Sequence, residues 1–112
     1  MPAAYSNLYL EQGTTFTTTI TLDDVYGETY NLAGYSASSQ MRKSYYSSNA
    51  TATFSTSINV GQGTVTLDLD ANTTANIAPG RYVYDAIIYD SNTHVTTRIL
   101  EGIIEVSPRV TR

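Results

Sequence analysis

Apolar and polar side chains alternate along most of this 112-residue chain, which is the pattern of β-strands with one buried face. The alternation is cleanest in TTFTTTITL, where Phe16, Ile20 and Leu22 fall on one face and threonines fill the other. Turn residues separate the alternating runs at intervals of about 8 to 12 residues, the spacing of an antiparallel sandwich. The remaining runs cover residues 8–12, 35–41, 50–58, 65–69, 82–90 and 95–106.

This spacing predicts an all-β fold, an antiparallel immunoglobulin-like β-sandwich of about seven strands in one domain covering residues 1–112. A small barrel is the alternative. The chain has no cysteine and no tryptophan, so the disulfide and buried tryptophan of antibody domains are absent. We therefore expect inward aliphatic and aromatic side chains to hold the sandwich together.

Three segments interrupt the alternation. In DANTTANIAPG, Asp70 is a candidate N-cap, and Pro79-Gly80 stops a short helix predicted over residues 71–78. The run from Asp23 to Gly27 predicts a hairpin turn, because Asp favours turns and Gly accepts positive φ. Gly102 interrupts the last predicted strand and is interpreted as a β-bulge.

The segment PGRYVYDAIIYD, residues 79–90, is apolar on both faces. One interpretation is a central strand whose outer face is somewhat apolar, since single exposed apolar residues are common. The other, which we favour, is that Val83, Ile87 and Tyr89 pack against another chain, because contiguous apolar patches mark interaction surfaces. The first face consists of Tyr82, Tyr84, Ala86 and Ile88, and the second of Val83, Asp85, Ile87 and Tyr89.

Asp85 lies in the middle of the second face, and a covered carboxylate needs a partner. Arg42 and Arg98 both alternate onto outward positions of predicted neighbouring strands. Either arginine can reach Asp85, and we predict an Asp85–Arg42 ion pair. Tyr45 and Tyr46 lie in the polar stretch SYYSSNA, a predicted loop, and are further candidates for contact with a partner.

Composition narrows the class of protein. Only 14% of residues are charged, the net charge is −4, and the six basic residues are scattered, so we expect no nucleic-acid binding. No apolar run of about 18 residues is present, so we expect no membrane span. The first ten residues do not resemble a signal peptide, and with no cysteine the chain fits synthesis in a cytosol.

No catalytic site, metal site or cofactor is predicted. His94 lies in the turn DSNTH near Ser91 and Asp90, which is more often a solvated turn than a catalytic group. DLDAN at residues 68–72 imitates the start of a calcium loop, but Thr73 and Pro79 stand where Gly and Glu belong. A loose surface calcium site is the less favoured interpretation of these aspartates.

Four stretches together carry a family resemblance that covers nearly the whole chain. They contain an early Gln-Gly before a strand, an NL-x-GY turn into a strand ending in Arg-Lys, and PGRYVYD before a final strand ending near VTR. In this order they resemble small structural proteins of tailed bacteriophages, above all the N-terminal domain of the phage baseplate upper protein and its cyanophage-type relatives. The stretches are QGTTFTTTITL, YNLAGYSASSQMRKS, GTVTLDLDANTTANIAPGRYVYDAIIYD and TRILEGIIEVSPRVTR.

The resemblance implies an immunoglobulin-like sandwich that is assembled in the host cytoplasm and incorporated in a virion. Its partners would be other virion proteins, in symmetric multiple copies, and its function would be structural and not enzymatic. A tail, baseplate or fibre-joint position is favoured over a capsid cement or decoration role. A receptor- or carbohydrate-binding module that uses Tyr26, Tyr45 and Tyr46 remains an alternative.

Overall fold

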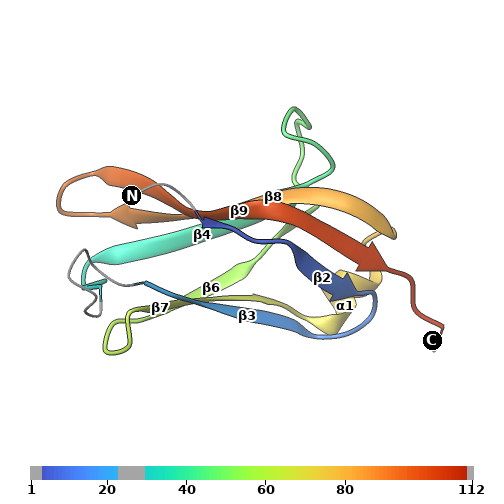
Figure 1. Ribbon diagram of the computed structural model, residues 1–112, viewed down its shortest axis with the longest axis horizontal. Coiled ribbons are helices and arrows are strands. Elements are labelled where there is room, and N and C mark those ends of the chain that lie inside the picture. The colour runs from blue at the N-terminus through green and yellow to red at the C-terminus, as the bar shows by residue number, and fades with distance from the viewer. Residues whose placement is uncertain (1–3, 23–29, 111–112) are drawn as a thin grey trace.

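Two β-sheets pack face to face in the computed structural model, which describes residues 4–22 and 30–110 (Figure 1). The predicted turn at residues 23–27 lies outside the described residues. A short helix, α1, follows the last strand of the smaller sheet. The larger sheet contains β1 (Ala4–Tyr5), β2 (Leu8–Glu11), β4 (Tyr35–Arg42), β5 (Ala52–Thr53), β8 (Gly80–Asp90) and β9 (Val95–Ser107). The smaller sheet contains β3 (Phe16–Thr21), β6 (Ser55–Asn59) and β7 (Thr64–Leu69), and α1 covers Ala71–Ala75.

The strand order confirms the predicted immunoglobulin-like sandwich. The larger sheet runs β1-β9-β8-β4-β5, with β2 also on β9, and the smaller sheet runs β3-β7-β6. In this arrangement β4, β8 and β9 correspond to strands C, F and G of the immunoglobulin fold, and β3, β7 and β6 correspond to B, E and D. The described residues form nine strands where about seven were predicted, because β1 precedes the first predicted strand and the strand predicted over residues 50–58 is divided into β5 and β6.

The N-terminal strands differ from the predicted antiparallel pairing. Both β1 and β2 run parallel to β9, with Ala4 opposite Leu100 and Leu8 opposite Ile104. The two pieces share one register, and Ser6 and Asn7 separate them. Alternation within a strand cannot reveal this pairing, because parallel and antiparallel neighbours bury the same face.

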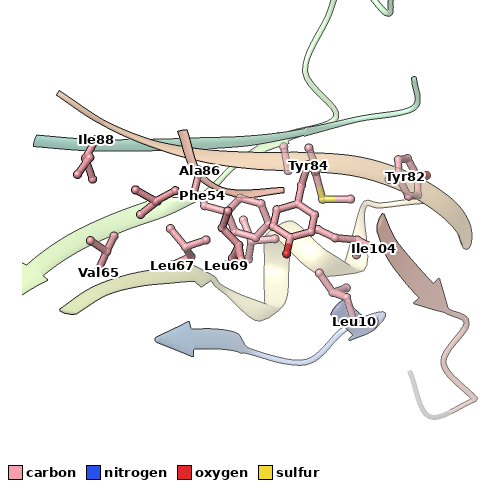
Figure 2. Close-up of a cluster of buried hydrophobic side chains, with 14 of the residues drawn as sticks. Leu10, Phe54, Val65, Leu67, Leu69, Tyr82, Tyr84, Ala86, Ile88 and Ile104 are labelled. Carbon is pink, nitrogen blue, oxygen red and sulfur yellow. The ribbon is translucent and has the colours of Figure 1, made fainter. Parts of the chain in front are cut away.

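The core lies between the sheets and confirms which face of β8 is buried (Figure 2). Tyr82, Tyr84, Ala86 and Ile88 are each at most 5% exposed. Val65 and Leu67 of β7 meet them from the smaller sheet, and Figure 2 shows these side chains between the two layers. The period-2 alternation of β7 therefore predicts its buried face correctly.

The connection from β7 to β8 is the predicted helical turn, shorter than expected. Asp70 caps α1 by accepting a hydrogen bond from the Thr73 amide at 2.7 Å, as predicted. The helix ends at Ala75 instead of reaching residue 78. The Tyr82 hydroxyl then donates to the Ala78 carbonyl at 2.6 Å, which is the geometry of the tyrosine corner found between strands E and F of many immunoglobulin-like domains.

Gly102 is not the site of the β-bulge, contrary to prediction. The β8–β9 register shifts between Ala86 and Ile87, where Ile99 is the extra residue, while Gly102 stays paired with Tyr84. A Cβ on Gly102 would collide with the Ser6 carbonyl, and that carbonyl accepts a hydrogen bond from the Tyr84 hydroxyl at 2.6 Å. Gly102 is required by the close approach of the N-terminal strand to β9.

Candidate interaction surface

The outer face of the larger sheet carries the apolar positions that the sequence singled out on β8. Val83, Ile87 and Tyr89 are all partly exposed, as is Asp85, whereas the alternate residues Tyr84, Ala86 and Ile88 are buried. Val83 lies opposite Ile103 of β9, which is also partly exposed, so the apolar surface continues onto the next strand. Ile87 is flanked by Ser38 of β4 and by Arg98 of β9. This face therefore carries apolar residues on β8 and β9, with Asp85 between Val83 and Ile87, and is polar along β4.

Two tyrosines of the N-terminal strands extend this outer face. Tyr5 lies opposite Glu101 and Tyr9 lies opposite Glu105, positions of β9 that point away from the core. Their exposed fractions are 61% and 72%. Sequence reasoning missed both residues, although Leu8 and Leu10 flank Tyr9 with the opposite phase and could have indicated that it points outward.

The loop between β4 and β5 projects from the sandwich on the side of the larger sheet (Figure 1). It holds Tyr45 and Tyr46, which are 66% and 96% exposed, in agreement with their expected position in a loop. Arg42 holds the base of this loop, since its Nη1 donates to the Ser47 carbonyl at 3.0 Å. The loop therefore presents two large aromatic rings at one end of the outer face.

A surface hollow of about 260 Å³ lies where the loop meets the outer face. Its aromatic and aliphatic lining consists of Tyr45, Val83 and Tyr84. Gln40, Arg42, Asp85 and Arg98 supply its polar lining. The hollow thus offers both hydrogen-bond donors and acceptors beside an aromatic ring.

The predicted Asp85–Arg42 ion pair is wrong, although both residues lie on the expected face and line the same hollow. Asp85 Oδ2 instead lies 3.4 Å from Arg98 Nε, and Arg98 Nη1 lies 3.3 Å from Glu101 Oε2. The register alone does not separate the two arginines, because Arg42 lies opposite Val83 and Arg98 lies opposite Ile87, so both are diagonal to Asp85. The Arg42 guanidinium has other partners, the Ser47 carbonyl among them. Arg42 Nη2 donates to Gln40 Oε1 at 2.9 Å.

The placement of Arg98 reduces the repulsion between two carboxylates. Asp85 and Glu101 are directly opposed across β8 and β9, a like-charge pair that destabilises a sheet. The Arg98 guanidinium contacts both of them. Because the Arg98 and Asp85 side chains are 53% and 42% exposed, this pair contributes only about 0 to 1 kcal/mol to folding. Its larger effect is to keep the outer face close to neutral.

The polar side chains of the hairpin between β8 and β9 form hydrogen bonds within the protein. The Tyr89 hydroxyl and His94 Nδ1 are 2.7 Å apart, and Ser91 Oγ donates to the Gly34 carbonyl at 2.9 Å. Asp90 accepts a hydrogen bond from the Asn92 amide, which lowers the pKa of its carboxyl. Ser91 and His94 therefore have separate partners, and the turn does not assemble a nucleophile with its base.

The two aspartates of DLDAN have different surroundings. Asp70 is the N-cap of α1, and its hydrogen bonds with Thr73 lower the pKa of its carboxyl. Asp68 points outward from β7, between Thr17 and Ser55 on the neighbouring strands. Across residues 4–22 and 30–110, no three His, Cys, Asp or Glu side chains are grouped in a way that could hold a metal ion. In the same residues no helix is long and apolar enough to cross a membrane.

Comparison with known proteins finds structures with a similar fold but gives no information about function. No protein-family model matches the chain, and no curated protein sequence matches it. Among solved structures, 255 chains match, so the fold is widely shared and does not by itself specify an activity. InlP of Listeria monocytogenes is one of them, with a TM-score of 0.53 and 18% sequence identity. The match covers 94% of this chain and 28% of InlP, and identity this low shows likeness of fold alone.

Proposed function

We propose that this chain is a non-enzymatic structural protein of a tailed-bacteriophage particle, and that it binds neighbouring virion proteins through the outer face of the β4–β8–β9 sheet. A tail, baseplate or fibre-joint position is favoured over a capsid position, because the sequence resembles the baseplate upper protein. Localisation in the virion, and multiple symmetric copies, follow from the same resemblance.

The observation that carries the proposal is the second apolar face of β8. Its inner face already fills the core, so Val83, Ile87 and Tyr89 are not needed there. Together with Tyr5 and Tyr9 they form a surface rich in tyrosine and poor in uncompensated charge, which is the composition of protein–protein interfaces. The protruding Tyr45 and Tyr46 add rings of the kind that anchor interfaces.

The candidate catalytic side chains of the described residues are not arranged together, which supports a structural function over catalysis. His94 is bonded to Tyr89, and Ser91 is bonded to a backbone carbonyl. The hollow beside Tyr45 is lined by carboxylate, guanidinium and amide groups and by two tyrosines, Tyr45 and Tyr84, but by no serine, threonine or histidine, and the Tyr84 hydroxyl is bonded to the Ser6 carbonyl. A catalytic site requires such groups within hydrogen-bond reach of one another.

Incorporation of variants into assembling particles tests the proposal. Ile87→Asp places a charge at the centre of the outer face, and Asn59→Asp adds the same charge to an exposed position of the smaller sheet. We expect tagged wild-type chain and Asn59→Asp to co-purify with particles and Ile87→Asp to stay free as folded protein. Incorporation of Ile87→Asp at the wild-type level would contradict the proposal.

A carbohydrate- or receptor-binding function is the second candidate, favoured by one observation. Tyr45 is exposed beside the polar groups of the hollow, and an aromatic ring next to planar hydrogen-bonding groups suits a sugar ring. A glycan array separates the two functions. Binding that Tyr45→Ala abolishes and Ile87→Asp leaves intact would favour this second function.

A further inference from the structure

The smaller sheet is closed at one side and open at the other. At the β6 side, the Phe54 amide donates to the Ser39 carbonyl, and Thr56 Oγ1 donates to the Ala37 carbonyl, both at 2.9 Å. These bonds join β6 to β4 of the larger sheet. At the opposite side, within the described part of the chain, β3 pairs with β7 alone. Among residues 4–22 and 30–110, the edge of β3 is therefore the open edge of the smaller sheet.

The backbone of β3 directs a regular set of polar groups to this open edge. The Leu22 amide donates to the Gly63 carbonyl at 2.9 Å, which sets the phase of the β3–β7 ladder. In an antiparallel pair the bonded positions alternate, so Phe16, Thr18 and Ile20 face β7. The N–H and C=O groups of Thr17 and Thr19 then face away from β7, in the position from which a further strand is added.

The edge lacks the features that natural proteins use to prevent pairing with another strand. Charged residues, proline and bulges normally protect an exposed edge. The β3 sequence FTTTIT contains no charge and no proline, and its register with β7 is continuous. The three strands of the smaller sheet carry one charged residue, Asp68, which lies on the central strand.

The core is also incompletely covered at this edge. Phe16 and Ile20 point inward but stay partly exposed, whereas their neighbours Val65 and Leu67 on β7 are 0% exposed. A strand added beside β3 would bring alternate side chains over these residues and complete the burial.

We propose that the open edge of β3 accepts an extended segment of another protein chain as an additional strand, uncharged and with apolar residues at alternate positions. The apolar residues would cover Phe16 and Ile20, and the absence of charge matches the uncharged edge. Addition of a strand to a sheet edge is an established mode of peptide recognition. A second copy of the whole domain fits less well, because each copy carries a net charge of −4.

A synthetic peptide with the sequence TTFTTTITL, that of residues 14–22, serves as the probe, since it has no charged side chain and its apolar residues fall at alternate positions. A peptide of the same composition with its three apolar residues adjacent is the matched control. Hydrogen exchange is followed by NMR on the isolated chain. We expect fast exchange of the Thr17 and Thr19 amides without peptide, and roughly tenfold slower exchange when the alternating peptide is present at ten times its Kd.

Thr19→Pro is the decisive variant. The Thr19 amide faces the open edge, so proline removes no bond to β7 and edge strands tolerate it. We expect this variant to fold, and we expect the alternating peptide no longer to slow the exchange of its Thr17 amide. Slow hydrogen exchange of the Thr17 and Thr19 amides in the isolated wild-type chain would overturn the proposal. So would equal slowing of their exchange by the alternating peptide and by the control peptide. A concentration-dependent dimer that Thr19→Pro dissolves would identify a second copy as the occupant and would also overturn it.

Discussion

At the scale of single residues, the position of the N-terminal strand depends on one glycine and one tyrosine. Gly102 lets the Ser6 carbonyl approach β9, and the Tyr84 hydroxyl donates to that carbonyl. Tyr84 lies opposite Gly102 in the register, so its ring covers the place where a side chain is missing. The contact joins residues at opposite ends of the chain, and no local sequence pattern could have predicted it.

Gly102→Ala tests this close approach. The added Cβ would collide with backbone that cannot move without disturbing β1 and β2. We expect the free energy of unfolding to fall by about 1 to 3 kcal/mol, the range for overpacking in a rigid site. Urea unfolding measures it. Gly61→Ala is the control, since a Cβ there meets only the Asn59 side chain at ordinary contact distance, and we expect a change within about 0.5 kcal/mol.

Tyrosine ionisation gives a pH dependence at the same scale. Burial raises the pKa of Tyr84 to about 12, and a hydrogen bond with Tyr30 followed by burial raises the pKa of Tyr35 to about 12. Unfolded tyrosine ionises near pH 10, so above that pH the unfolded state has lost protons that the folded state keeps. We expect stability that is constant below about pH 10 and falls as the pH approaches 12.

The Tyr84→Phe variant distinguishes the contributions of Tyr84 and Tyr35 to the pH dependence of stability. It removes the bond to Ser6, so it should be less stable than wild type at neutral pH by about 1 to 3 kcal/mol. Its loss of stability between about pH 10 and pH 12 should be smaller than that of wild type, because only Tyr35 then contributes. Equal pH slopes in urea titrations of the two proteins would show that Tyr84 does not ionise on unfolding.

At the scale of elements, α1 connects the two ends of the chain. Thr74 is completely buried, and its Oγ1 accepts from the Gly13 amide at 3.1 Å and donates to the Thr14 carbonyl at 2.7 Å. Gln12 Nε2 donates to the Ile77 carbonyl, and Gln12 Oε1 accepts from the Arg109 amide. The early Gln-Gly of the sequence, which lies between β2 and β3, is thus joined to α1 and the residues after it and to the segment after β9.

Thr74→Val tests this connection with little change in shape. The variant leaves the Gly13 amide and the Thr14 carbonyl without their partner in a partly buried site. We expect the free energy of unfolding to fall by about 1 to 3 kcal/mol. Thr53→Val at an exposed position of β5 is the matched control, expected to change stability by less than about 0.5 kcal/mol in the same denaturant experiment.

The two faces of β8 give the sharpest prediction for an element. Ile88 is 1% exposed in the core, whereas Ile87 is partly exposed on the outer face. Ile88→Asp should therefore abolish the cooperative thermal transition, because it buries an unpaired carboxylate. Ile87→Asp should keep the transition within a few degrees of wild type. Similar unfolding by both variants would mean that the outer face is part of the core.

The sequence predicts elements better than it predicts how they are connected. Alternation correctly identifies the strands and the buried face of β8, because burial of one face requires that period. It does not show that β1 and β2 run parallel to β9, nor that Ile99 and not Gly102 makes the bulge. It also leads to the wrong arginine for Asp85, since Arg42 and Arg98 are both diagonal to Asp85 and only the contacts of Arg42 with Gln40 and Ser47 separate them.

At the scale of the whole molecule, charge is distributed unequally between the two sheets. The strands of the smaller sheet contain one charged residue, whereas those of the larger sheet contain eight. On the outer face of the larger sheet, Asp85 and Glu101 lie between the apolar pair Val83–Ile103 and Ile87, so apolar residues and paired charges are mixed there. The eight residues are Glu11, Arg42, Arg81, Asp85, Asp90, Arg98, Glu101 and Glu105.

Function was the least predictable property from the sequence. The resemblance to baseplate upper protein is a pattern of strands and turns, and an immunoglobulin-like fold serves many unrelated proteins. What the structure adds is a surface. Tyr5 and Tyr9 join Val83, Ile87 and Tyr89 only because β1 and β2 pair with β9, so the full surface could not have been assembled from sequence positions.

A cryo-EM map of the assembled particle, with this chain located in it, would show which surface of the chain contacts a neighbouring protein. We expect the outer face of β4, β8 and β9 to be covered by that protein, with Ile87 and Tyr89 inside the contact. A map in which the chain is attached through other surfaces and this face is open to solvent would contradict it. So would the absence of the chain from purified particles.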